Sequence, residues 1–319
     1  MRKAVFAVAA AAALVVPEPA GAEAQPVSYA TTTQSRTVET FARVPLYLTQ
    51  GAPSSTVFLD HQSVPQCEVN AGLFDGSSFE EYVELSSGGS YKNPTKVKAG
   101  QARGALPDKA EFGTAPGPTA QAACPTALTG TGRATSGGIV TDQLSVESAT
   151  TTATAIAVKQ DSESVVVSEA VTKLQGVKLA DVSLRHLESW LKVEWRADQE
   201  PLVSYRLAIS GLFNGAKAVL LNGERGVVLQ GKGLTGPEFV KQFNQQSKAH
   251  ETALEQLGTY SFRLLEPNVY QDASGRHIIE SFAVNAGFGF AARKNQMGHF
   301  QGIRLAAATV SGRMVPFGS

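Results

Sequence analysis

The five histidines are the first residues to consider for chemistry, because a neutral imidazole can act as a general base or bind a metal ion. They lie far apart in the sequence, at His61, His186, His250, His277 and His299. None belongs to an H-E-x-x-H motif or to another compact ligand pattern. His250 falls on the apolar face of a predicted helix, where a packed histidine is far more common than a catalytic one. The sequence therefore predicts no metal site and no catalytic histidine.

Motifs for an activated nucleophile or a bound phosphate are missing from the sequence. No serine lies in a G-x-S-x-G elbow or between a strand and a helix. The glycines at 287–289 lack the helix and lysine that follow a phosphate-binding loop. Glu80, Glu81 and Glu84 are spaced differently from the ligands of a calcium loop. We therefore predict no catalytic residue and no cofactor, although a triad that assembles only in three dimensions stays an alternative.

Cys67 and Cys124 are the two cysteines of the chain. In an oxidising compartment two such cysteines usually pair. The metal alternative is weak, because a structural zinc site needs about four nitrogen or sulfur ligands and the sequence offers none at useful spacing. We therefore predict a disulfide between Cys67 and Cys124, which would stabilise the fold by roughly 2–5 kcal/mol.

Trp190 and Trp195 are candidates for stacking against a carbohydrate ring. Residues five apart point to opposite faces of a regular strand. At most one of the two indoles is therefore expected to face solvent, while the other packs in a core.

Residues 1–24 have the parts of a secretory signal peptide. Arg2 and Lys3 precede the apolar stretch Ala4–Val16, which is shorter than the roughly 20 residues of a membrane span. Small residues then provide sites for cleavage after Ala22 or Ala24. The alternative is an uncleaved N-terminal anchor. We expect a mature protein that is secreted and extracellular, in part loosely associated with the cell wall, with no further transmembrane segment.

The charge of the chain is balanced, with 28 basic and 28 acidic residues. Neither sign is concentrated in one stretch. A nucleic-acid-binding protein would need a basic stripe to neutralise phosphates. We therefore predict that no nucleic acid is a partner.

Residues 25–138 are predicted to form a loop-rich region that the disulfide ties together. From about Tyr91 to Gly138 the chain is dense in Gly, Pro, Ala and Thr and has few bulky apolar residues. Such a composition buries too little apolar surface to offset the entropy of ordering. We therefore expect mostly loop or linker in this part.

Residues 139–319 are predicted to form a β-rich domain, in an antiparallel sandwich or a curled sheet. Thr150–Val158 alternates strictly, with β-branched residues on one face and small residues on the other, which indicates a strand. Further strand-like runs are Val165–Leu174, Val177–Leu184, Trp190–Arg196 and Leu202–Ser210.

One amphipathic helix is predicted at about 236–257 and is expected to pack on the sheet. Thr235 and Glu238 fit a capping box. The apolar face that follows consists of Phe239, Val240, Phe243, His250, Ala253, Leu254 and Leu257. A long strand at 278–290 is predicted to place bulky residues on one face, namely Ile278, Phe282, Val284, Phe288 and Phe290. We expect the helix to cover that face.

Several different strand and turn motifs lie between Ser136 and about Phe290. They are the Ser/Thr/Ala-rich run 148–155, Leu179–Leu184, Ile209–Leu212, the Asn222-Gly223 turn and Phe262–Pro267. In these motifs the chain resembles a set of exported β-rich proteins of actinobacteria that have no assigned function. The resemblance covers roughly half of the chain and implies a β-rich exported domain. It implies no activity.

These observations favour a noncatalytic extracellular or cell-envelope-associated protein with a structural or binding role. Two alternatives stay open: a carrier of an apolar ligand such as a lipid, and a secreted hydrolase. An enclosed apolar cavity would favour the carrier, and a Ser–His–Asp cluster in a cleft would favour the hydrolase. A filled core would favour the structural or binding role.

Overall fold

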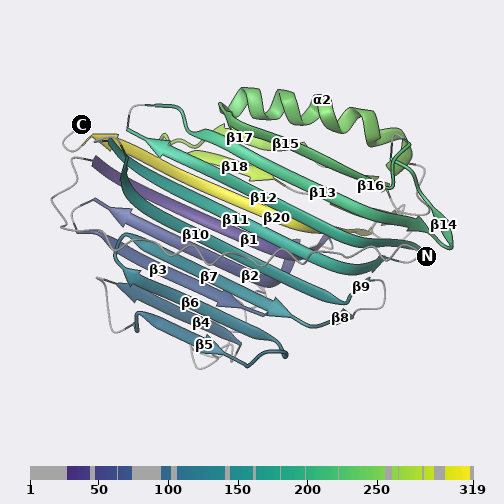
Figure 1. Ribbon diagram of the computed structural model, residues 1–319, viewed down its shortest axis with the longest axis horizontal. Coiled ribbons are helices and arrows are strands. Elements are labelled where there is room, and N and C mark those ends of the chain that lie inside the picture. The colour runs from purple at the N-terminus through teal and green to yellow at the C-terminus, as the bar shows by residue number, and fades with distance from the viewer. Residues whose placement is uncertain are drawn as a thin grey trace, which may run out of the picture.

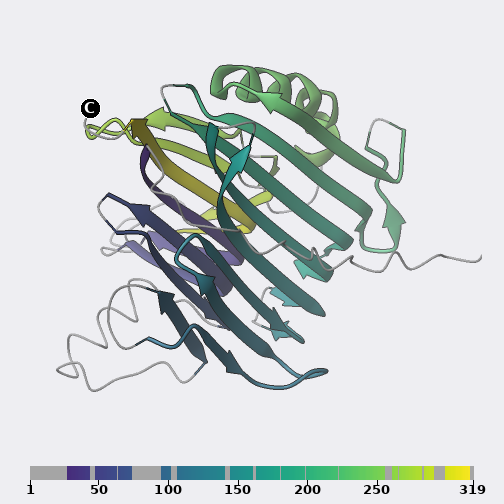
Figure 2. The ribbon, with the colours of Figure 1, turned by 60° about the vertical axis from the view of Figure 1, so that its left-hand side comes forward.

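The computed structural model describes residues 27–43, 47–62, 64–73, 95–101, 106–140, 144–160, 163–179, 181–197, 199–221, 223–255, 261–264, 266–281, 284–290 and 299–316. The described chain is mainly antiparallel β-structure in two sheets, with one long helix on an edge. Figures 1 and 2 show the two sheets lying face to face as a curved sandwich. The predicted fold class is therefore confirmed.

The first sheet has the strand order β16-β19-β20-β1-β2-β3-β4, with β18 also paired to β20 and β17 paired to β18. We call it sheet A. Its strands are β1 (Val27–Arg43), β2 (Tyr47–His61), β3 (Gln66–Gly72), β4 (Lys96–Gln101), β16 (Ser261–Arg263), β17 (Asn268–Gln271), β18 (His277–Ser281), β19 (Val284–Phe290) and β20 (His299–Pro316).

The second sheet has the strand order β14-β13-β12-β11-β10-β7-β6-β5, with β15 paired to β13, and β9 and β8 paired beside β11. We call it sheet B. Its strands are β5 (Lys109–Phe112), β6 (Thr119–Thr126), β7 (Thr129–Ser136), β8 (Ile139–Val140), β9 (Leu144–Val146), β10 (Ser148–Gln160), β11 (Glu163–Leu179), β12 (Val182–Arg196), β13 (Leu202–Asn214), β14 (Lys217–Ala218) and β15 (Gly226–Leu234).

The division of the chain at residue 138 does not match this architecture. β1 pairs along its length with β20, so the first and last described strands lie side by side in sheet A (Figure 1). Sheet B likewise joins β5–β7 to β10 and the strands that follow. Residues from both predicted regions therefore build the same two sheets.

The expectation that 25–138 is loop-rich is wrong for the residues that the structure describes, because β1 to β7 lie there. Small residues build strands here because the facing sheet comes very close. A Cβ atom at Gly130 would lie 2.6 Å from Val57 Cγ1 and 2.9 Å from Cys67 Sγ, and one at Gly132 would lie 3.2 Å from Ser55 Cβ. The lack of bulky side chains thus permits close packing of the sheets. Composition alone suggests the opposite, namely that such a segment has no core.

The predicted disulfide is present and joins the two sheets. Cys67 lies in β3 of sheet A and Cys124 in β6 of sheet B, and their Cα atoms are 6.0 Å apart. Both residues are buried. The bridge therefore ties together two layers of one sandwich and does not restrain a loop.

The interior between the sheets is filled largely with small and β-branched side chains. In the alternating strand β10, the small face is the buried one, with Ala153 and Ala155 fully buried. Buried hydroxyl groups pair across the sheets: Ser35 Oγ lies 2.7 Å from Thr172 Oγ1, and Ser55 Oγ lies 3.2 Å from Thr151 Oγ1. These contacts leave the two sheets close together along the centre of the sandwich.

Two of the predicted strands have different bounds. The run Val177–Leu184 is a hairpin, in which β11 ends at Leu179 and β12 begins at Val182.

The run 278–290 consists of β18 and β19, and the buried face changes between them. Ile279 is buried while Ile278 is half-buried, and beyond the break Val284 is buried. Ala306 of the partner strand β20 has φ of 56°, so the regular alternation is interrupted on both strands. Phe282 lies outside the described residues.

The helix α2 (Gly236–Glu255) is confirmed close to its predicted bounds. Glu238 accepts hydrogen bonds from the backbone N–H and the hydroxyl of Thr235, each 2.9 Å long, as expected for the reciprocal half of a capping box. These bonds hold the pKa of Glu238 below its usual value.

The position of α2 differs from the expectation that it covers 278–290. Its principal neighbours are β15 and β13 of sheet B and β16 and β17 of sheet A. Phe239 and Phe243 are buried against Tyr205 of β13, with ring centroids 4.9 and 5.7 Å away. The helix therefore covers an edge of the sandwich, as Figure 1 shows, and spans from one sheet to the other.

Candidate functional site

The histidines that the sequence offers for chemistry are not brought together. His61 is buried in β2, His186 lies in β12, His250 lies on α2 and His277 begins β18. In the described ranges no three His, Cys, Asp or Glu side chains gather as a possible metal site. The structure does not describe the side chain of His299.

The outward face of sheet B carries a charged cluster centred on Glu188. Its carboxylate lies 3.2 Å from Arg206, 3.5 Å from His186 and 3.8 Å from Lys173. Trp190 faces the same side and donates a hydrogen bond to Glu169. Charges that pair across strands in this way are typical of a solvated sheet face. His186 also belongs to the wall of a wider pocket on this face.

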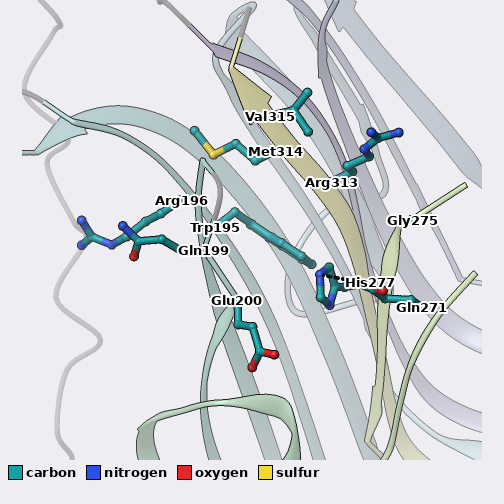
Figure 3. A pocket seen from close by; sticks show the side chains of 10 residues that line it. All are labelled: Trp195, Arg196, Gln199, Glu200, Gln271, Gly275, His277, Arg313, Met314 and Val315. Atoms are coloured by element: carbon teal, nitrogen blue, oxygen red, sulfur yellow. Dashed lines mark hydrogen bonds between the residues drawn. The ribbon is translucent and has the colours of Figure 1, made fainter. Parts of the chain in front are cut away.

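A polar pocket lies where the two sheets meet at one end of the sandwich (Figure 3). Its volume is about 310 Å³. Sheet B contributes the end of β12 and the loop after it, and sheet A contributes the β17–β18 hairpin and the end of β20. We call it the Trp195–His277 pocket. It is lined by Trp195, Arg196, Gln199, Glu200, Gln271, Gly275, His277, Arg313, Met314 and Val315.

Trp195 is held in place as one wall of this pocket. It is 2 % exposed, and its Nε1 donates a 3.2 Å hydrogen bond to Ser168 Oγ. On the opposite sheet Gly312 makes room for the indole, since a Cβ atom there would lie 3.1 Å from two of its ring carbons. Trp190 is on the outer face and Trp195 in the core, as the strand alternation predicts.

His277 is positioned by the hairpin between β17 and β18. Asp272 Oδ1 accepts hydrogen bonds from the backbone N–H groups of Ser274 and Arg276, and this turn pairs Gln271 with His277. Gln271 Nε2 lies 2.7 Å from His277 Nε2, so the amide donates and the ring nitrogen accepts. Burial lowers the pKa of His277, while the carboxylate of Glu200 opposes that shift. The imidazole is therefore neutral at neutral pH.

The charges at the pocket are unequally placed. Arg196 pairs with Glu163 at 2.8 Å. Arg313 is exposed and donates to the carbonyl oxygen of Ser274, and Figure 3 shows its side chain directed away from Trp195. Glu200 makes no ion pair with another described residue. The pocket thus presents one free carboxylate beside a neutral imidazole and two carboxamides.

A second, wider pocket of about 750 Å³ lies on the outer face of sheet B. Its walls include Glu147, Lys178 and Arg185, and the Arg185 guanidinium lies 5.0 Å above the ring of Phe213. Gly176 has φ of 59° and leaves the space that the Glu147 side chain occupies. The charged wall residues Glu147, Lys178 and Arg185 are all exposed, so the pocket holds few charged groups in fixed positions.

The sequence offers Trp195 as a candidate for ring stacking and His277 only as one of five scattered histidines without a predicted role, and it gives no signal for the others. Gln199, Glu200, Gln271 and Met314 belong to no motif, and they meet only because β12, β17 and β20 end at the same place. Asp272 and Gly275 are residue types that are typical of turns, and this turn is the local feature that helps to place His277.

No family model matches the chain, and a search of curated proteins also finds no match. Among solved structures, a putative AttH from Nitrosomonas europaea aligns over 94 % of this chain and 98 % of its own, with 8 % identity and a TM-score of 0.23. OccAB4 of Acinetobacter baumannii aligns over 91 % and 98 %, with 6 % identity and a TM-score of 0.13. OccK2 of Pseudomonas aeruginosa aligns over 91 % and 97 %, with 9 % identity and a TM-score of 0.15. These scores are too low to inform the function of this chain.

Within the described ranges no helix has the length and apolar character needed to cross a membrane.

Proposed function

We propose that this chain is an exported, noncatalytic binding protein of the cell exterior or envelope. The observation that carries the proposal is the Trp195–His277 pocket, which has a rigid wall and a mixed set of hydrogen-bonding groups. Concave sites with a few fixed polar groups are the usual form of a small-molecule site. Export itself rests on the predicted signal peptide, and residues 1–24 lie outside the described structure.

A carrier of an apolar ligand fits the described structure less well. Such a carrier needs an enclosed apolar volume to remove the ligand from water. The space between the central strands is instead occupied by alanine side chains and paired hydroxyl groups, as at Ser35 and Thr172. Both pockets described above have charged side chains in their walls.

A hydrolase also fits the pocket less well. The residues that line the Trp195–His277 pocket include no Ser, Thr or Cys that could attack a substrate. The ring of His277 is hydrogen-bonded to the carboxamide of Gln271. A neutral carboxamide cannot stabilise a protonated imidazole in the way that the carboxylate of a catalytic triad does. The pocket is therefore suited to holding a ligand and not to cleaving it.

A thermal-shift screen of the purified mature protein tests this proposal. The library should contain sugars, amino acids, nucleosides and small organic acids. We expect at least one compound to raise the melting temperature of the wild type, and to raise that of Glu200→Ala and His277→Ala much less. Proton NMR of the mixture after prolonged incubation should show the compound unchanged.

Two results would overturn the proposal. One is that no compound stabilises the protein, or that the pocket variants respond as the wild type does. The other is conversion of a bound compound into a product, which would favour the hydrolase. Fractionation of cells expressing the full chain checks location separately, because a cytoplasmic protein with an intact N-terminus would contradict export.

A further inference from the structure

We propose that the Trp195–His277 pocket binds one sugar unit of a neutral saccharide. This inference rests on the proposed binding function and names the ligand class of the same site. It follows from the size of the pocket, from its hydrogen-bonding groups and from its charge.

The size of the pocket limits the ligand to about one ring. Its volume of about 310 Å³ is at the lower end of the range of roughly 300–1,000 Å³ that is typical of small-molecule sites. Because the pocket is open to solvent at the edge of the sandwich, the remainder of a longer saccharide can extend outward.

The hydrogen-bonding groups match hydroxyl groups, each of which both donates and accepts. Glu200 is an acceptor with two oxygens, and its charge strengthens the hydrogen bonds it receives. The carboxamide of Gln271 provides a donor and an acceptor beside His277, whereas that of Gln199 lies beside Arg196 on the other side of Trp195 (Figure 3). The neutral ring of His277 uses Nε2 as acceptor for Gln271, so its proton is on Nδ1, and that nitrogen bonds to no other described residue.

The charge of the pocket disfavours an anionic ligand. Arg196 is neutralised by Glu163, and Arg313 is directed to the outer side of sheet A. The carboxylate of Glu200 remains and would repel an anion. A neutral polyol avoids this repulsion, and its hydroxyl groups can donate hydrogen bonds to the carboxylate of Glu200.

The remaining wall is apolar and suits the C–H faces of a sugar ring. It consists of Met314 and the edge of Trp195, whereas the side chain of Val315 lies on the same face of β20 as Arg313 (Figure 3). Since Trp195 is almost fully buried, it provides a fixed edge and not a full stacking platform.

The two tryptophans make a direct binding assay possible. In Trp190→Phe the single remaining indole is Trp195, at the pocket wall. We expect its emission to change saturably on titration with at least one of glucose, galactose, mannose, N-acetylglucosamine or maltose. Saturation-transfer NMR on the wild type with the same sugar should show contacts to one ring.

Glu200→Ala is expected to weaken that binding by at least about tenfold, with little change in melting temperature because Glu200 is exposed. Glu194→Ala is the matched control. Glu194 lies on the outer face of β12 and pairs with Lys192 at 2.8 Å, so its loss should leave sugar binding unchanged.

Choline and acetate serve as competing probes. Binding of choline or acetate but of no sugar would overturn the saccharide inference and leave the binding function standing. Sugar binding that is unaffected by Glu200→Ala would also overturn the assignment to this pocket. If no compound of any class binds, the proposed function fails together with this inference.

Discussion

At the scale of single residues, the position of Trp195 depends on a missing side chain. Gly312 of β20 faces the indole across the sandwich, and a Cβ atom there would lie 2.9 Å from Thr31 Cγ2 and 3.1 Å from the ring. Both neighbours are buried and therefore cannot move away freely. The pocket wall is thus set by a glycine on the sheet opposite to the tryptophan.

We predict that Gly312→Ala destabilises the protein by about 1–3 kcal/mol, because the methyl group forces the indole or the strand to shift. Gly137→Ala is the control, since a Cβ atom at Gly137 would meet nothing within 4 Å. Denaturant unfolding of the two variants measures the difference. Equal unfolding midpoints for both variants would show that the indole does not lie against Gly312.

The half-buried imidazole of His277 gives the protein a pH dependence of known sign. Its folded-state pKa is lowered below 6.5 by burial. As the pH falls from 6.5 towards the folded-state pKa, the unfolded chain takes up a proton before the folded protein does. The contribution to stability is therefore full above 6.5 and is lost through that window.

We predict that His277→Gln makes the melting temperature less dependent on pH between about pH 7.5 and about pH 5. The variant lacks the titrating ring but keeps a polar group. Scanning calorimetry across this range provides the measurement. If the melting temperature of the variant falls as steeply with pH as that of the wild type, folding does not lower the pKa of His277.

At the scale of elements, α2 completes an edge of the sandwich. The carboxamide of Gln246 accepts from the backbone N–H of Gln230 and donates to its carbonyl, both at 3.0 Å. Gln242 donates to the same carbonyl. Because β15 follows β13 at the end of sheet B, these bonds satisfy backbone groups that would otherwise be open to another strand. The phenylalanine side chains beside them exclude water from the junction.

Phe243→Asp should destabilise the protein by several kcal/mol, because it places a charge without a partner against Tyr205. Gln245→Asp is the control, since Gln245 lies on the exposed side of the helix. Melting temperatures of the two variants test the docking. Small and equal decreases would mean that α2 does not pack through Phe243.

The helix and the individual strands were predictable because their signals are local. Thr235 and Glu238 mark the start of α2, and the alternation at 150–158 marks β10. The strands from 96 to 136 were missed because their alanine and glycine residues support a strand only when a second sheet packs closely, as Val57 does on Gly130. That information is in the pairing of the sheets and not in the segment itself.

At the scale of the whole molecule, the disulfide was predictable and its role was not. Counting cysteines gave the pair Cys67 and Cys124. The bridge joins two sheets because β1 pairs with β20, and the strands β1 to β7 thereby become part of the same sandwich as the strands that follow. The candidate site was unpredictable for the same reason, since Glu200, His277 and Met314 come from three segments that only this topology brings together.

The export prediction concerns residues 1–24. The protein recovered from the culture medium or the envelope should begin after Ala22 or Ala24, and its mass should correspond to one disulfide and no free thiol. Intact mass under nonreducing conditions gives both results. A full-length N-terminus would contradict export by signal-peptide cleavage.

The central claim is that side chains fill the described interior between the central strands of the sandwich, so that a ligand binds at the polar edge and not between the sheets. Native mass spectrometry of the purified protein, supported by organic extraction, tests it most directly. We predict the mass of the processed chain without an apolar adduct, and an extract without lipid. A lipid that copurifies in stoichiometric amount would contradict the claim and would identify the protein as a carrier.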